Sequence, residues 1–336
     1  MDPDWKLAET DRVTVVIATR NRRADLLRFL DSLVGRVPVV VVDNDSRDGT
    51  AAAVRTAFPS VRIAVLPRNR GAAARNVGVR LATTPYVAFG YLDSAWAAGT
   101  LAQAARIFDR QRALGLLAAR TIGGSDPAAS ETAVRSLRPD SVPVLGFRGR
   151  AAFVRRDAFL AVGGFSSVSF STNEAMLLSY DLAAAGWALA YVDTVVMHQR
   201  SSTRSARRRL ELRNLLLISW MRRPLRRACA DAFRLAHCAT VSADACVAFG
   251  SALIRLPWAL ANRRRLPPQV ESEILRLERN RRRLIRGAWI FVECGTLSRT
   301  RHRTSSPPTA IWGTGVGPRG RWRRRTGRMA IWRITY

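Results

Sequence analysis

Lysine is almost absent from this chain of 336 residues, in which Lys6 is the only lysine among 55 basic residues. A need for positive charge alone rarely excludes lysine so completely, so we attribute most of the arginine excess to a genome that favours arginine and alanine. Residues 1–200 hold 25 basic and 18 acidic residues, whereas residues 201–336 hold 30 and 7. The formal net charge of +30 therefore belongs mainly to the C-terminal part, where a polyanionic partner would act.

Cysteine is also scarce, and its spacing excludes two classes of small domain. The chain has no C-x-x-C pair and no histidine at zinc-finger distance from a cysteine, which argues against a zinc finger. A disulfide framework is not expected in a chain this long with so few cysteines. The four are Cys229, Cys238, Cys246 and Cys294.

Long uninterrupted apolar runs are missing as well. The most apolar late stretch, residues 235–261, is broken by His237, Asp244 and Arg255, so a membrane span is not expected there. An amphipathic helix lying on a membrane surface is still compatible with this pattern. Residues 1–11 are polar and acidic, which predicts no signal peptide.

The glycine-rich phosphate loops of two large nucleotide-binding classes are absent. No G-x-G-x-x-G follows the first predicted strand, and no G-x-x-x-x-G-K-[ST] occurs anywhere. A dinucleotide site of the Rossmann type and a P-loop both lose support.

The hydrophobic content of 48% is enough for a packed core and excludes wholesale disorder.

Segments typical of buried strands alternate with helical segments in the first half of the chain. Strands followed by helices of this length predict βαβ units and a mainly parallel sheet. Strands are predicted at residues 13–18, 37–43, 61–66 and 86–89, and helices at 23–35, 50–58 and 71–81.

Aspartate, asparagine or arginine follows each of the four predicted strands. Ligands of such sheets bind beyond the C-terminal ends of the strands, so these residues are expected to share one site. Carboxylates bind hydroxyls and base N–H groups, while arginines and helix N-termini bind phosphates. The pattern therefore favours a phosphate-and-ribose ligand; the residues lie at 19–22, 43–50, 68–71 and 90–93.

Seven segments follow one another along the first 200 residues: VTVVIATRNR (13–22), VVVVDNDSRDGT (39–50), RNRGAAARNVGV (68–79), YVAFGYLDSAWAAGTL (86–101), VGGF (162–165), NE (173–174) and DLAAAGW (181–187). In this order they resemble the inverting family 2 glycosyltransferases of bacteria, which have the GT-A fold. The resemblance covers about residues 12–200.

The resemblance implies an α/β fold of the GT-A type, with a mixed, mainly parallel sheet flanked by helices. It implies transfer of a hexose-type sugar with inversion, from a UDP- or dTDP-linked donor to an acceptor hydroxyl. The acceptor would be a saccharide, a lipid-linked or a small molecule, as in the synthesis of cell-envelope polysaccharide. The implied location is cytoplasmic, or peripheral to the inner face of the membrane.

The resemblance also assigns a donor site to residues at the strand ends. Thr19 would lie beside the base, and Asp43 would bind the base or the ribose with Asp45 close by. Arg70 and Arg75 would approach the diphosphate. For Asp43 and Asp45 the alternative is turn and N-cap chemistry ahead of the helix predicted at residue 50.

The implied metal site departs from the family pattern. Family members usually carry consecutive acids just after the fourth strand, and here those positions read Tyr91, Leu92 and Asp93. Asp93 alone can suffice, because Mg²⁺ or Mn²⁺ accepts one protein carboxylate together with diphosphate oxygens and water. His198, which follows the strand predicted at 188–197, would be a second ligand to the metal or the diphosphate; a structural role is the alternative.

The implied catalytic base is Glu174. Inversion requires a carboxylate that removes the proton of the acceptor hydroxyl, and Glu174 is the only acid between Asp157 and Asp181. The alternative is a capping box in which Ser171 caps a helix and Glu174 supports it.

Two tryptophans near these segments could stack on a sugar or belong to the core. Trp96 lies just past the implied metal position and is predicted to contact the donor. Trp187 follows Ala-Gly before a predicted strand and is assigned to the core.

The rest of the chain predicts a helical extension at residues 201–286 and a basic tail of low order at 287–336, after a catalytic domain at 1–200. A helix is predicted at 204–223, and helical segments continue to about residue 286. Basic, amphipathic helices fit contact with anionic lipid or simple packing on the catalytic domain. The tail has ten arginines and one acid; it could bind nucleic acid non-specifically, be a disordered tail, or arise by translation past a frameshift.

Three functional hypotheses remain open at this point. The first is a glycosyltransferase. The second is a catalytically degenerate relative that binds sugar nucleotides, motivated by Tyr91 and Leu92 at acid positions. A nucleic-acid-binding protein ranks last, because it explains the tail but not the polar strand ends.

Overall fold

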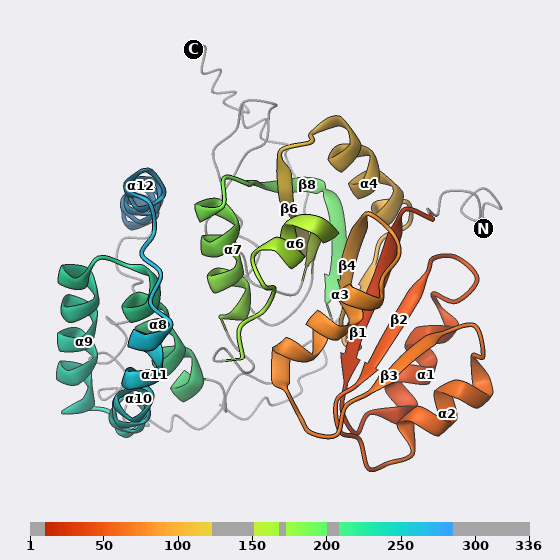
Figure 1. The fold of residues 1–336 in the computed structure, drawn as a ribbon, viewed down its shortest axis with the longest axis horizontal. Helices are drawn as coiled ribbons and strands as arrows, with labels where there is room; N and C mark the ends of the chain where they lie inside the picture. Colours follow the sequence, from red (N-terminus) through yellow and green to blue (C-terminus); the bar gives the residue numbers. More distant parts are fainter. Residues whose placement is uncertain (1–10, 123–150, 168–172, 200–207, 285–336) are drawn as a thin grey trace, which may run out of the picture. The chain divides into compact units, whose positions relative to one another are not determined.

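An eight-stranded mixed sheet forms the centre of the N-terminal part of the chain (Figure 1). The computed structural model describes residues 11–122, 151–167, 173–199 and 208–284. The strand order is β3-β2-β1-β4-β7-β6-β8-β5. The strands are β1 (Val13–Thr19), β2 (Val39–Asp43), β3 (Arg62–Val65), β4 (Tyr86–Gly90), β5 (Ser94–Trp96), β6 (Leu114–Ile122), β7 (Ala152–Arg155) and β8 (Ala188–Gln199).

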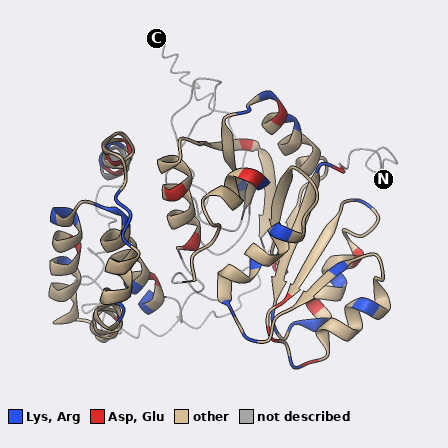
Figure 2. Ribbon diagram, in the orientation of Figure 1, with Lys and Arg blue, Asp and Glu red and all other residues tan. Residues whose placement is uncertain are grey.

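The first four strands are parallel neighbours, as the alternating pattern predicts. β1 pairs with β2 and β4, and β2 pairs with β3, all in parallel, while β7 joins β4 in antiparallel orientation. β1 and β4 carry no charged residue (Figure 2), so they can be buried on both faces. The predicted mixed, mainly parallel GT-A type of sheet is confirmed.

Two layers of helices cover the two faces of the sheet. One hydrophobic core packs α1 (Arg23–Asp31), α2 (Thr50–Ala57) and α4 (Thr100–Arg110) against one face. A second core packs α3 (Arg75–Leu81), α6 (Arg156–Ala161) and α7 (Glu174–Ala184) against the other. Alternate residues of each strand serve each core, which is why continuous valine runs suit these strands.

Glycine permits the closest approach of a helix to the sheet. A Cβ atom at Gly78 of α3 would lie 2.4 Å from Val16 of β1, closer than two carbon atoms can pack. Any larger residue there would push α3 away from the strand ends that it borders.

Two predicted helices differ in extent from the observed ones. The helix predicted at 23–35 ends at Asp31, and the following turns reach Gly35 with φ +84°, a left-handed conformation suited to glycine. The helix predicted at 71–81 begins as a 3₁₀ turn, η2 (Gly71–Ala74), and continues as α3. Sequence periodicity does not distinguish these tighter turns from α-helix.

Five helices follow the sheet and share a third hydrophobic core, which confirms the predicted helical region. This core includes Leu177 and Tyr180 of α7, so α7 packs on both the sheet and the later helices. The helices are α8 (Arg208–Arg222), α9 (Leu225–Ala239), α10 (Ala243–Ile254), α11 (Leu256–Ala261) and α12 (Pro268–Leu284). The predicted domain boundaries near residues 200 and 286, and the predicted low-order tail, lie outside the described residues.

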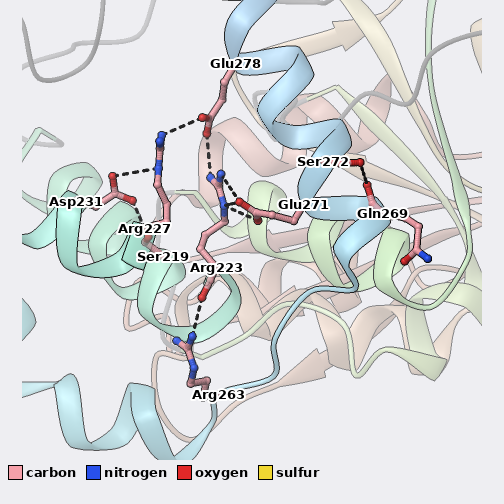
Figure 3. A network of polar contacts seen from close by, with 9 residues as sticks. All are labelled: Ser219, Arg223, Arg227, Asp231, Arg263, Gln269, Glu271, Ser272 and Glu278. Carbon is pink, nitrogen blue, oxygen red and sulfur yellow. Dashed lines mark hydrogen bonds and ion pairs between the residues drawn. The ribbon is translucent and has the colours of Figure 1, made fainter. Parts of the chain in front are cut away.

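A network of buried ion pairs ties these helices together (Figure 3). Arg223 donates to Glu271 at 2.8 Å and to Glu278 at 2.9 Å, and Arg227 reaches Glu278 at 2.9 Å. Arg263 donates to the carbonyl oxygen of Arg223 at 2.7 Å. Several arginines of this region are therefore structural rather than solvated.

A second ion pair joins α8 to α7. Arg222 forms a bidentate contact with the carboxylate of Asp181 at 2.5 and 3.0 Å, and both side chains are largely buried.

Within the described ranges, no helix is both long and apolar enough to cross a lipid bilayer.

Candidate active site at the strand ends

The loops after β1 and β2 are bound to each other. The side-chain oxygen of Asn21 accepts a hydrogen bond from the backbone N–H of Arg47 at 2.7 Å. The backbone N–H of Asn21 donates to the hydroxyl of Ser46 at 3.0 Å. Arg20 forms an ion pair with Asp45 at 3.2 Å. Asn21 and Asp45 both have positive φ, 51° and 68°, which the short polar side chains tolerate. The two loops therefore form one continuous polar edge of the sheet.

Thr19 and Asp43 lie opposite each other at this edge, one at the end of each strand. Both are buried, with exposed fractions of 5% and 2%. Asp43 accepts from the backbone of Ser46 at 2.9 Å, so the predicted turn chemistry does occur at one of its oxygens. The hydroxyl of Thr19 is buried without a hydrogen-bond partner among the described residues. A buried hydroxyl in that condition is costly unless a ligand completes it.

Asn44 is an organising residue that sequence reasoning missed. Its amide donates to Asn69 at 2.9 Å, and its oxygen accepts from the backbone of Arg70 at 2.8 Å. Asn69 in turn accepts from the backbone of Gly71 at 2.9 Å. These bonds fix the loop after β3 to the end of β2; a polar residue directly after five buried strand residues was the available signal.

Asp48 belongs to the turn before α2. It accepts from the hydroxyl of Thr50 at 2.5 Å and from the backbone of Arg23 at 3.0 Å. The bond from the Thr50 hydroxyl, supported by backbone donors, holds the pKa of Asp48 below its usual value. Its carboxylate is therefore occupied by local structure.

Arg75 and Glu174 form a buried ion pair next to the strand ends. Nη1 of Arg75 lies 3.5 Å from Oε1 of Glu174, and the two side chains are 10% and 11% exposed. The distance suits an ion pair, yet the geometry makes no hydrogen bond, so Nη1 and Nε of Arg75 are both buried without a partner in the described structure. The arginine thus holds unused donors at the position where the diphosphate is predicted.

Three other buried side-chain nitrogen atoms in the described part of the chain lack a hydrogen bond, the Nε atoms of Arg227, Arg234 and Arg263, and the first of these lies 3.6 Å from Asp231 in an ion pair. Each of these arginines is bonded through another nitrogen. The unpaired groups of Thr19 and Arg75 are therefore distinctive, and both were predicted as donor-binding residues.

Aromatic rings and a clamped turn hold Arg75 in place. Its guanidinium lies 4.6 Å from the ring centre of Tyr91 and 5.5 Å from that of Phe165. Asn76 exchanges two hydrogen bonds of 2.9 Å with the backbone of Phe165. Gly164 has φ +73°, and a Cβ there would lie 2.6 Å from Phe159. Asn76 is the second residue that sequence reasoning missed.

Glu174 is the first residue of α7. The N-cap is Asn173, with φ 60° and no side-chain capping bond, so the capping box of Ser171 with Glu174 is wrong. Asn173 instead donates to the backbone oxygen of Glu211 at 3.1 Å. Ser171 lies outside the described residues. The carboxylate of Glu174 consequently serves no local cap and faces Arg75.

The two predicted metal ligands lie near each other in the strand pairing, one in the turn before β5 and one on β8. Asp93 directly precedes β5. His198 of β8 is paired with Ala95 of β5, which follows Asp93 by two residues. His198 is exposed and Asp93 is half-buried. The described residues contain no group of three or more metal-ligating side chains. One carboxylate and one imidazole fit an ion that takes its remaining ligands from a diphosphate and water, rather than a site closed by protein.

The remaining predicted residues are placed as follows. Arg70 is exposed, and only its backbone is bound, to Asn44. Trp96 packs against Phe153 at 4.6 Å between ring centres, so its ring contributes to the core, and its contact with a donor stays a prediction. Trp187 packs on the second core, as predicted.

Comparison with known proteins assigns the family. Residues 14–177 match the family model described as Glycosyl transferase family 2. The N-acetylglucosaminyl-diphospho-decaprenol L-rhamnosyltransferase of Mycobacterium tuberculosis is 31% identical over 240 residues, covering 58% of this chain and 78% of that protein. This chain belongs to glycosyl transferase family 2. The resemblance predicted from the motifs is confirmed, and with it the reaction class, glycosyl transfer.

Other relatives of this family 2 transferase match over smaller shares of their length. The pre-mycofactocin glycosyltransferase of M. tuberculosis is 34% identical over 197 residues, 53% of this chain and 40% of that protein. The solved structure of S. aureus TarS 1-349 in complex with UDP has a TM-score of 0.46 at 18% identity, covering 62% of this chain and 64% of that one. The complex with UDP-GlcNAc gives 0.47 at 17%, covering 62% and 66%. The chain thus spans well under half of the pre-mycofactocin enzyme and just under two thirds of these TarS structures.

Proposed function

We propose that this chain transfers a sugar, with inversion, from a UDP- or dTDP-linked donor bound at the ends of β1, β2 and β4. One observation carries the proposal: Thr19 at the end of β1 and Arg75, which lies over Tyr91 after β4 and is ion-paired with Glu174, hold buried polar atoms without a hydrogen-bond partner in the described structure. A buried polar group without a protein partner is expected where a bound ligand completes its hydrogen bonds. A sugar nucleotide offers a polar base and ribose hydroxyls to Thr19 and a diphosphate to Arg75.

The donor would be held by charge and by desolvation together. Asp43 and the Thr19 hydroxyl suit the base and the ribose, because both are buried at the same edge of the sheet. Arg75 supplies N–H donors to the diphosphate from a buried position, where charge-assisted bonds are strong. Arg70 is exposed at the rim and adds attraction that salt will screen.

Asp93 and His198 would hold Mg²⁺ or Mn²⁺ against the diphosphate. When bound, such an ion neutralises the charge that develops on the leaving diphosphate. The chain's own contribution is one carboxylate from the turn before β5 and one imidazole from β8, which pairs with β5. The positions next to Asp93 serve packing instead, since Leu92 joins the first core and Tyr91 stacks on Arg75.

Glu174 would act as the general base. Its carboxylate takes the proton of the acceptor hydroxyl while the hydroxyl oxygen bonds to the anomeric carbon. The bond from that carbon to the diphosphate oxygen breaks, and its electron pair leaves with the nucleoside diphosphate. Arg75 is ion-paired with Glu174 through Nη1, and neither its Nη1 nor its Nε makes a hydrogen bond in the described structure, so it would donate to the diphosphate and orient the base relative to the donor.

A lipid-linked saccharide is the acceptor that we propose. The M. tuberculosis rhamnosyltransferase, which this chain covers to 78%, is named for a diphospho-decaprenol-linked acceptor. Polysaccharide of the cell envelope would then be the end product.

The decisive experiment measures binding and turnover for a panel of UDP-, dTDP- and GDP-sugars with Mg²⁺, Mn²⁺ or a chelator. Binding is followed by calorimetry, and turnover by release of nucleoside diphosphate with and without a lipid-linked saccharide. We expect micromolar to millimolar binding of one donor class and turnover that requires the metal. Donor binding without turnover under any condition would identify the chain as a degenerate sugar-nucleotide-binding relative, and absence of all binding would overturn the proposal.

A further inference from the structure

Helix α10 buries alanines and exposes several larger hydrophobic residues, while Phe249 packs partly on the third core. Its buried positions are Ala245, Ala248 and Ala252. Val247 and Ile254 are 51% and 79% exposed. A helix of a water-soluble surface shows the opposite distribution, with large apolar residues inside and polar residues outside. The exposed side of α10 is thus apolar without being needed for the core.

The same reversal continues into α11. Ala259 is buried, while Trp258 and Leu260 are 39% and 43% exposed. α11 follows α10 after the single residue Arg255, so the exposed residues are close in the chain. We call this set the α10–α11 face; it consists of Val247, Leu253, Ile254, Trp258 and Leu260.

The exposed apolar residues concentrate in this part of the molecule. Of the ten large hydrophobic residues that are exposed in the described ranges, eight lie between Leu225 and Leu260. Scattered single residues of this kind need no explanation, but a concentration marks an interaction surface.

Exposed arginines adjoin the α10–α11 face in the sequence. Arg255 lies between α10 and α11, and Arg264 and Arg265 follow shortly after α11; all three are exposed. α10 itself has no basic residue and one acid, Asp244, which is ion-paired with Arg209. An apolar surface with a basic border is complementary to a bilayer that contains anionic lipid.

We propose that the α10–α11 face docks on the surface of a membrane rich in anionic phospholipid. Twelve residues of α10 span about 18 Å, well short of the roughly 30 Å of a hydrocarbon core, so the helix lies in the interface. Val247, Ile254 and Trp258 enter the boundary of the acyl chains, and the arginines bind phosphate groups of the lipids. This inference stands on the helical region alone and does not depend on the proposed catalytic step.

The first test places a polarity-sensitive fluorophore at Cys246, which is exposed on α10 directly before Val247. Cys229 and Cys294 are replaced by serine in the otherwise full chain, and Cys238 is buried. With vesicles of phosphatidylglycerol and phosphatidylethanolamine, we expect a blue shift and quenching by lipids brominated in their acyl chains. A label that stays in water while the protein sediments with the vesicles would overturn the proposal, because the basic tail alone would then explain binding.

The second test uses substitutions on the face with a matched control. Val247→Glu and Ile254→Glu, each in the full chain, should weaken vesicle binding at least ten-fold and abolish the blue shift. Val65→Glu is the control, because Val65 is a valine with the same exposed fraction, 51%, on β3 of the sheet. The tail is identical in all variants, so its contribution cancels. Equal binding by Val247→Glu and Val65→Glu would overturn the proposal.

Self-association is the competing occupant of the α10–α11 face. Sedimentation velocity without lipid should show the same species for the wild type and Ile254→Glu. A dimer that Ile254→Glu dissociates would overturn membrane docking in favour of a second copy of the chain.

Discussion

A buried ion pair between Arg75 and Glu174 is the central feature at the residue scale. The two side chains come from different helices, α3 and α7, and both are about nine-tenths buried. Removing one partner of such a pair leaves an uncompensated charge, which costs several kcal/mol. The pair is retained together with unpaired donors on Arg75, a combination that fits a ligand site better than a purely structural contact.

We expect Glu174→Gln to separate binding from transfer. The amide keeps the shape of the side chain but accepts no proton, so transfer should fall by about 10²–10⁴-fold while donor affinity changes little. Turnover and calorimetric titration of the donor measure the two effects. Glu273→Gln, an exposed change on α12, should leave both unchanged. If Glu174→Gln transfers sugar at the wild-type rate, another group is the base.

Asp93→Ala should remove the metal dependence of donor binding. The substitution takes away the only carboxylate that we assign to the ion, so addition of Mn²⁺ should no longer strengthen donor binding in calorimetry. Asp157→Ala is a matched control, because the Asp157 side chain is 88% exposed on α6. Identical metal dependence in both variants would remove Asp93 from the site.

At the scale of elements, short turns decide where the site residues lie. Asn44 ties the end of β2 to the loop after β3, and Asn76 ties α3 to the turn that carries Phe165. Both asparagines join segments that are distant in the sequence. Neither bond has a signature in hydrophobic periodicity, so only the folded chain identifies the two residues as organisers of the site.

Asn76→Ala should lower both stability and turnover. Loss of two hydrogen bonds leaves the backbone N–H and carbonyl of Phe165 without their partner, which costs about 1–3 kcal/mol. Turnover should fall as well, since Phe165 no longer holds Arg75. Denaturant unfolding and steady-state rates measure the two effects. Asn262→Ala, at an exposed residue whose side chain donates to the nearby backbone oxygen of Trp258, serves as the control and should cost clearly less.

At the scale of the whole molecule, buried arginines join the later helices to each other and to α7. Arg223 binds two glutamates of α12, and Arg222 binds Asp181 of α7. The third core also takes residues from α7. The helical region is therefore integrated with the sheet through one shared helix.

Arg223→Met should destabilise the fold by about 3–5 kcal/mol, because it leaves Glu271 buried without its partner. Arg226→Met is the matched control, because Arg226 is exposed on the same helix region, and its change should lie within about 0.5 kcal/mol. Denaturant unfolding followed by far-UV circular dichroism gives both values. Equal stability of the two variants would show that the network in Figure 3 contributes nothing.

Stability should also fall at alkaline pH. Burial raises the pKa of Tyr180, so the unfolded chain loses the phenolic proton at a lower pH than the folded chain does. The stabilisation is fully present below the unfolded pKa of about 10 and is lost as pH rises above it. Tyr180→Phe should therefore show a shallower decline of unfolding free energy above pH 10; Tyr86 and Tyr191, whose pKa values burial also raises, add to the decline that is left. An unchanged slope would contradict this assignment.

The sequence by itself determined the architecture and the list of candidate residues. Valine runs such as those of β1 and β2 favour strands buried on both faces, and the polar residues after parallel strands are expected at one edge of the sheet. That logic pointed to Thr19 and Asp43, while the resemblance to family 2 glycosyltransferases added Arg75. The logic works because the period of a strand and the direction of parallel pairing are local properties.

The tertiary structure decided which of those residues meet and which are already occupied. In the folded chain, Arg75 is ion-paired with Glu174, Asp48 is engaged in a turn, and Trp96 packs on the core. The structure also shows that several hydrophobic residues of α10 are exposed, although the apolar composition of this helix by itself is typical of a buried helix. These outcomes depend on side-chain contacts between segments far apart in the chain, and such contacts exist only after the sheet and its helices have packed.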